Sequence, residues 1–173
     1  MATAAFDYKF LNGIVQNIFV VNPASIVTVN QSHGFDACHP PTVEEMQDWW
    51  DNSPYYVYNL YLGGSLFACD DEPLDPFWVQ QVAGQGWEFI LAWVGPQAPC
   101  TGYYEKMSSN PSVAYQEGRS EAEMAIDAAD QLGILVDRVI YYDVEAYFGA
   151  SSSCRNAVSS FINGWTDQLH ESG

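Results

Sequence analysis

The chain has 173 residues, and its 5 basic and 22 acidic residues give a formal net charge of −17 at pH 7. Such a chain is a poor partner for nucleic acid or anionic lipid, because proteins bind both through cations. Aromatic residues make up 15% of the sequence, which excludes a disordered chain and supplies material for a core. The length fits one domain, but a complete eight-stranded α/β barrel takes about 250 residues, so we expect at most part of one.

Residues 1–32 form an N-terminal extension whose structure the sequence leaves uncertain. Two short strands are expected at 18–21 and 26–29, on either side of Asn22-Pro23. The first ten residues contain Asp7 and Lys9 and do not resemble a signal peptide. No apolar run reaches the length of a membrane span, so we expect no membrane-spanning segment.

From residue 33 onward the pattern alternates between strands and helices. Strands are predicted at 34–37, 55–62, 87–94 and 139–144. The first two are followed by helices that start at a Thr42–Glu45 capping box and at an Asp75 N-cap. A long loop is expected over 95–118, then a helix from a capping box at Ser120 to Gly133, and lastly an amphipathic helix over 154–169. This alternation predicts an α/β fold with a parallel sheet, whose site lies beyond the carboxyl ends of its strands.

Acidic residues occupy those strand ends. Asp36 ends the first predicted strand, and Asp143 and Glu145 end the fourth. Residues i and i+2 of a strand share a face, so Asp143 and Glu145 should project together. One of two adjacent carboxyls tends to keep its proton, and an acid beside an anion is what glycosidic cleavage needs. A solvated or helix-capping Asp-x-Glu and a site for a hard cation remain as alternatives, although no further acidic cluster is tied to these residues by spacing. We expect no metal and no cofactor.

Aromatic residues lie at or near the same strand ends. They are Tyr61, Trp87, Trp93 and Tyr147. Sugar rings present apolar C–H faces that stack on aromatic rings, whereas the alternative is that these side chains belong to an ordinary core.

The four cysteines, at positions 38, 69, 100 and 154, contain no CxxC pair. A zinc ribbon or a thioredoxin-type site is therefore disfavoured. Two disulfides formed in an oxidising compartment and four buried thiols remain open, and three pairings are possible if the cysteines are bridged.

Several motifs occur together in one order. They are His33-Gly34-Phe35-Asp36-Ala37-Cys38, Met46 with Trp49, Ser53-Pro54-Tyr55, Tyr61-Leu62-Gly63-Gly64, Gly86-Trp87, Val94-Gly95-Pro96-Gln97-Ala98-Pro99-Cys100 and Tyr141-Tyr142-Asp143-Val144-Glu145-Ala146-Tyr147. Over about residues 33–170 the chain resembles the glycoside-hydrolase-like domain-of-unknown-function family 1906. That family is in turn similar to the family 25 glycoside hydrolases, lysozyme-like muramidases with a β/α barrel.

The resemblance implies a TIM-type (β/α) barrel domain over 33–173, truncated after about four βα units. It implies catalytic roles for Glu145 as general acid, for Asp143 as its anionic partner and for Asp36 in holding substrate or tuning the pair. The substrate groove would be lined by Tyr61, Trp93, Gln97 and Tyr147. It also implies oxidised cysteines and a secreted or extracellular protein.

The function expected from this resemblance is hydrolysis of a cell-wall or extracellular polysaccharide such as peptidoglycan. The alternative is a non-catalytic glycan-binding or wall-associated module, or an inactive barrel fragment. Because both outer strands of a four-stranded partial barrel are open edges, self-association is also expected.

Overall fold

The computed structural model describes residues 8–11, 14–17, 33–69, 74–134, 139–147 and 151–173. The strands predicted at 18–21 and 26–29 lie outside these residues. Near the N-terminus, β1 (Tyr8–Leu11) pairs antiparallel with β2 (Ile14–Asn17). This hairpin is not among the predicted elements, although the Asn12-Gly13 dipeptide between two apolar runs is a strong hairpin signal.

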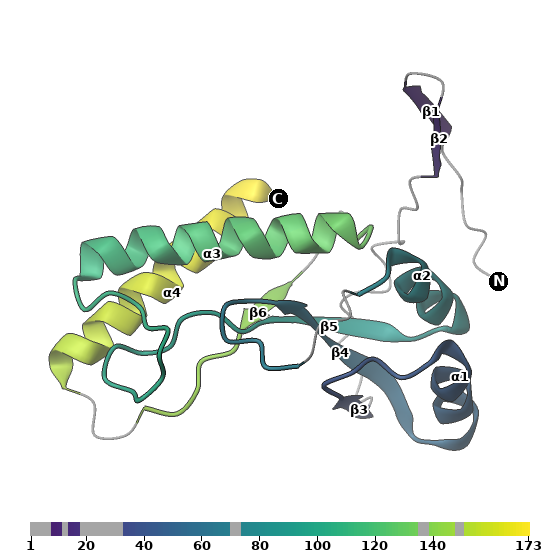
Figure 1. The fold of residues 1–173 in the computed structure, drawn as a ribbon, viewed down its shortest axis with the longest axis horizontal. Helices are drawn as coiled ribbons and strands as arrows, with labels where there is room; N and C mark the ends of the chain where they lie inside the picture. Colours follow the sequence, from purple (N-terminus) through teal and green to yellow (C-terminus); the bar gives the residue numbers. More distant parts are fainter. Residues whose placement is uncertain (1–7, 12–13, 18–32, 70–73, 135–138, 148–150) are drawn as a thin grey trace.

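The main sheet has four parallel strands in the order β3-β4-β5-β6 (Figure 1). They are β3 (His33–Asp36), β4 (Tyr55–Gly63), β5 (Glu88–Trp93) and β6 (Ile140–Tyr142). Each strand is followed in the chain by one helix: α1 (Val43–Asn52), α2 (Pro76–Gln85), α3 (Pro111–Gln131) and α4 (Ser152–Ser172). The predicted α/β fold with a parallel sheet is therefore confirmed.

Local side-chain chemistry starts the first two helices where the sequence predicts. The Thr42 hydroxyl accepts a hydrogen bond from the Glu45 N–H at 3.2 Å, and the Glu45 carboxylate accepts one from the Thr42 N–H at 2.8 Å. The Asp75 carboxylate caps α2 by accepting from the Phe77 N–H at 2.9 Å. Both caps satisfy backbone donors that a helix start leaves without partners.

The predicted long loop over 95–118 and the helix start at Ser120 are wrong. Helix α3 begins at Pro111, with Asn110 as its N-cap, so it contains both Gly118 and Ser120. Helices α3 and α4 lie side by side (Figure 1). A Cβ on Gly118 of α3 would lie 2.0 Å from the carbonyl oxygen of Phe161 in α4. This glycine therefore serves close helix–helix contact and does not mark a loop.

The helices cover one face of the sheet. Alternate side chains of the strands, such as Tyr58, Leu60 and Leu91, are buried in one cluster with helix residues such as Met46 and Ala125. The opposite face is open, since Ile90 is 44% and Tyr141 58% exposed. A side chain at the carboxyl end of a strand therefore points either towards the helices or towards the open face.

The disulfides and the polarity of the helices bear on where the protein is located. Disulfides join Cys38 to Cys69 and Cys100 to Cys154, which selects one of the three possible pairings. Their presence is consistent with an extracellular protein. Within the described residues, no helix combines the length and the apolarity that crossing a membrane requires.

Candidate functional site

The strand register places the three predicted acids along one edge of the sheet. Asp36 pairs with Asn59 at the end of β3. Asp143 follows β6 directly, and its N–H donates to the Trp93 carbonyl at 2.9 Å. Asp36 and Asp143 thus lie on the two outer strands, separated by three strand spacings of about 4.8 Å each. Asp36 and Glu145 are exposed, whereas Asp143 is half-buried. Asp143 and Glu145 are neighbours at the end of β6, and Asp36 lies at the end of the other outer strand, β3.

Tyr61 lies on β4, between β3, which ends at Asp36, and the segment after β6 that carries Asp143 and Glu145. Burial raises the pKa of Tyr61, and the negative charges of Asp36 and Asp143 raise it further. Glu145 contributes in the same direction, while a hydrogen bond with Asn59 lowers the pKa. All three acids are therefore within electrostatic reach of one phenol. A tyrosine phenol is protonated at neutral pH, and the raised pKa of Tyr61 extends this to higher pH, so the hydroxyl can donate a hydrogen bond to a ligand.

The other tyrosine at this end of β4 lies on the helix-covered side. Tyr58 is 1% exposed, and its hydroxyl donates to the Ala37 carbonyl at 3.2 Å. Burial, followed by the charge of Asp36, raises the pKa of Tyr58 to about 12. Its phenol anchors the chain immediately after Asp36.

Trp93 does not lie with the exposed acids. Its side chain is 7% exposed, and the indole N–H donates to the Glu121 carboxyl at 2.6 Å. Glu121 comes from α3 and is 8% exposed, and burial raises its pKa although the bond from Trp93 lowers it. The predictions missed Glu121, because its burial results from long-range contact between α3 and the end of β5.

Gln97 is fully buried beside the segment that carries the carboxylate pair. Its side-chain Nε2 donates to the Asp143 carbonyl at 2.9 Å and to the Gly95 carbonyl at 3.1 Å. Its Oε1 accepts from the Glu145 N–H at 2.7 Å. The structure therefore brings Gln97 to the backbone of the acidic pair, with no exposed surface of its own.

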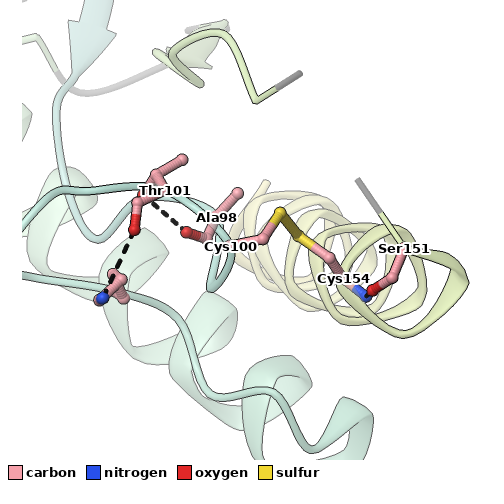
Figure 2. The surroundings of a disulfide bond; sticks show 6 residues. Ala98, Cys100, Thr101, Ser151 and Cys154 are labelled. Carbon is pink, nitrogen blue, oxygen red and sulfur yellow. Dashed lines mark hydrogen bonds between the residues drawn. A yellow bond between two sulfur atoms is a disulfide. The ribbon is translucent and has the colours of Figure 1, made fainter. Parts of the chain in front are cut away.

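The chain beyond Glu145 is tied to the loop that carries Gln97. Half-buried Tyr147 packs against a small cluster that includes Cys154 and Phe161. The disulfide between Cys100 and Cys154 joins this loop to the first turn of α4 (Figure 2). The Ser151 hydroxyl accepts from the Cys154 N–H at 3.2 Å and caps the helix there (Figure 2). Both ends of the segment 143–154 are thereby fixed to neighbouring elements.

A cleft of about 630 Å³ is lined by Tyr61 and by the residues that directly follow Asp36 in the chain. Its lining includes Tyr58, Tyr61 and Phe67, together with the Cys38–Cys69 disulfide and Leu132 of α3. The three acids do not line the cleft, so Tyr61 is the side chain common to both features. Among the described residues, no three His, Cys, Asp or Glu side chains gather closely enough to hold a metal ion.

The sequence matches a known protein family, and the fold is similar to that of a solved structure. The family model of the Rv2525c-like glycoside hydrolase-like domain matches residues 47–173. The chain is also similar to the crystal structure of an uncharacterized B. stearothermophilus protein, with a TM-score of 0.57 and 17% sequence identity. That similarity covers 81% of this chain but 56% of the other, so the chain spans little more than half of its length. At this identity the likeness shows the fold alone.

A search of curated proteins found no match. The family match confirms the resemblance drawn from the ordered motifs, including those around Trp49, Gln97 and Asp143. Since the matched residues make up well over half of the sequence, the chain belongs to the Rv2525c-like family of glycoside hydrolase-like domains.

Proposed function

We propose that the protein hydrolyses glycosidic bonds of a cell-wall or extracellular polysaccharide with the carboxyl pair Asp143 and Glu145. The observation that carries this proposal is the position of the pair directly after β6, within a glycoside hydrolase-like domain. Active sites of parallel α/β folds lie at this end of the sheet.

In the proposed reaction the exposed Glu145 donates its proton to the glycosidic oxygen as the bond to the anomeric carbon breaks. The anionic Asp143 stabilises the positive charge that develops on that carbon. Water then adds to the anomeric carbon, and its proton returns to Glu145. The two products are a new reducing end and a free hydroxyl group.

Four further residues would contact the substrate or support the pair. Tyr61 would offer its ring face to a sugar and its protonated hydroxyl to a sugar oxygen. Half-buried Tyr147 would line the same groove, and Asp36 would bind sugar hydroxyls from the end of β3. Trp93 would act from behind the site, through its buried contact with Glu121.

The proposal extends to architecture and location. The four-stranded sheet, covered by helices on one face, would form one side of a (β/α) barrel whose interior is the open face. The two disulfides support a secreted protein that meets its polysaccharide outside the cell.

The test is the release of reducing ends from peptidoglycan and from a panel of extracellular polysaccharides. Wild type should release them, and Glu145→Gln should reduce the rate at least about 100-fold, the scale of general acid catalysis. Glu123→Gln replaces an exposed glutamate of α3 and should leave the rate unchanged. Equal release by wild type and Glu145→Gln would overturn the proposal.

A second candidate function is glycan binding without turnover. It is favoured by the aromatic cleft of about 630 Å³, which none of the three acids lines. Titration calorimetry with the same glycans separates the two functions. Saturable binding that depends on Tyr61, together with no reducing-end release by wild type, would support the binding module.

A further inference from the structure

The backbone that carries the carboxyl pair extends beyond the hydrogen-bonded part of β6. The ladder between β5 and β6 ends at the pair Trp93–Tyr142, with one further bond from the Asp143 N–H to the Trp93 carbonyl. The next residue, Val94, bonds on the other side of its chain, where its N–H donates to the Gly63 carbonyl at the end of β4. The Asp143 C=O and the Glu145 N–H therefore need other partners, because backbone polar groups next to a core are rarely left unpaired.

The side chain of Gln97 supplies both partners. Its amide N–H group donates to the Asp143 carbonyl at 2.9 Å, and its amide oxygen accepts from the Glu145 N–H at 2.7 Å. In a parallel ladder, the N–H and the C=O of one residue bond to the two residues on either side of the residue that it faces. The Gln97 amide thus takes the place of a strand peptide facing Val144.

Gln97 is itself held firmly enough to impose this geometry. Its backbone N–H donates to the Glu105 carbonyl at 3.1 Å, and its own carbonyl accepts from the Met107 N–H at 2.9 Å. Its side chain is 0% exposed. The loop around it is also joined to α4 through Cys100 (Figure 2). The amide cannot turn away without breaking bonds in a buried site.

We infer that Gln97 is a positioning residue, whose side-chain amide extends the sheet by one residue pair and keeps the chain from Asp143 to Glu145 extended. In an extended chain residues i and i+2 share a face. Gln97 therefore holds both carboxyls towards the same side of the sheet edge. A catalytic use for the aligned carboxyls rests on the proposed function. The hydrogen bonds by which Gln97 aligns them do not depend on it.

The first test uses the wild-type protein and NMR. A scalar coupling across the hydrogen bond should join the Glu145 amide nitrogen to the side-chain carbonyl carbon of Gln97. The coupling between HN and Hα of Val144 should have the large value typical of an extended residue. The lack of the first coupling, together with a small value of the second, would overturn the inference without any substitution.

The second test replaces the amide. Gln97→Met keeps the length of the side chain but cannot hydrogen-bond, so the Glu145 amide hydrogen should exchange about tenfold faster or more. Gln97→Glu provides the rescue, because a protonated carboxyl restores one donor and one acceptor. Its Val144 coupling should approach the wild-type value as the pH is lowered.

The matched control is Gln85→Met. Gln85 is a partly buried glutamine whose amide donates to the Val43 carbonyl at 2.8 Å, far along the chain from the acidic pair. It should leave the Val144 coupling and the Glu145 exchange unchanged. A folded Gln97→Met protein with wild-type values for both would contradict the inference.

These measurements do not depend on turnover, so the two proposals can fail separately. If wild type releases no reducing ends but shows the coupling, the proposed function fails and the positioning role stands. If wild type is active, Gln97→Met should lower kcat more than it changes KM, since the chemistry needs both carboxyls aligned while much of the binding surface is unaffected.

Discussion

Asp36 acts on two tyrosines of β4, and one of them, Tyr61, is also affected by the charges of Asp143 and Glu145. The charge of Asp36 raises the pKa of Tyr61 and of Tyr58, and in each case burial is the larger cause. Asp36→Asn should therefore lower the pKa of both phenols, because it removes a negative charge that opposes phenolate formation. For Tyr58 the change starts from about 12.

NMR titration of ring-labelled tyrosine checks this expectation. Glu44→Gln, which replaces an exposed residue in the first turn of α1, should leave both titrations unchanged. Identical tyrosine titrations in wild type and Asp36→Asn would show that Asp36 does not face this group.

Glu121 is the buried acid that should make stability depend on pH. Burial raises its pKa above the ordinary value of 4.5, and the nearby Glu105 and Glu117 act in the same direction. From about pH 4.5 upward, the unfolded chain gives up this proton more readily than the folded chain does. The free energy of unfolding should therefore fall as the pH rises through the raised pKa of Glu121, by about 1.4 kcal/mol for each pKa unit.

Glu121→Gln tests this because a neutral amide can still accept the hydrogen bond from Trp93. Urea unfolding at pH 4.5 and pH 7 should show a smaller loss of stability in the variant than in wild type. Glu123→Gln replaces an exposed residue of the same helix and should lose as much stability between the two pH values as wild type does. The same pH dependence in wild type and Glu121→Gln would contradict a raised pKa of the buried Glu121.

At the scale of elements, α3 and α4 are held together through two glycines. A Cβ on Gly118 or on Gly164 would lie 2.0 Å from a carbonyl oxygen of the partner helix. Gly118→Ala should therefore force the helices apart and lower the free energy of unfolding by about 3 kcal/mol.

The control is Gly84→Ala in α2, where a Cβ would meet nothing within 4 Å. Alanine suits a helix interior better than glycine does, so this variant should be more stable by up to about 1 kcal/mol. Chemical denaturation measures both. Equal effects of the two substitutions would show that α3 and α4 are not in close contact.

The elements that could be predicted from sequence were those fixed by local chemistry. The capping box at Thr42 and the Asp75-Pro76 start need only neighbouring residues, and both are confirmed. The start of α3 was missed because Gly118 and Pro111 suggest loops, whereas contact with α4 and a cap from Asn110 make them helical. Such contacts join residues far apart in the sequence.

The candidate site shows the same division. The sequence predicted Asp36, Asp143 and Glu145 at strand ends. In the structure Asp36 is the last residue of β3, while Asp143 and Glu145 follow β6, which ends at Tyr142. It could not tell which strand-end side chains face the open surface. Trp93 and Gln97 are buried, and both bond to groups that come from other segments of the chain.

The whole molecule combines an open sheet face with a strong negative charge. Exposed Ile90 and Tyr141 favour contact with a second copy, while the net charge of −17 repels it. Because salt screens charge, dimerisation should strengthen as ionic strength rises from about 0.01 M, where the Debye length is about 30 Å, to 1 M, where it is about 3 Å.

Sedimentation velocity at several protein concentrations checks this, and Tyr141→Lys should weaken the association at every salt concentration. A monomer at all concentrations and both ionic strengths would contradict self-association through this face and its edges.

Under the proposed function, the edge of the sheet that bears Tyr61, Asp143 and Glu145 recognises a glycan. The most direct measurement is an NMR titration of the labelled protein with soluble peptidoglycan fragments and extracellular oligosaccharides. We expect saturable shifts of the amide signals of Tyr61, Asp143, Glu145 and Tyr147, and no shifts at the exposed face of α1. Saturable shifts elsewhere, or an unperturbed site with every glycan of the panel, would contradict it.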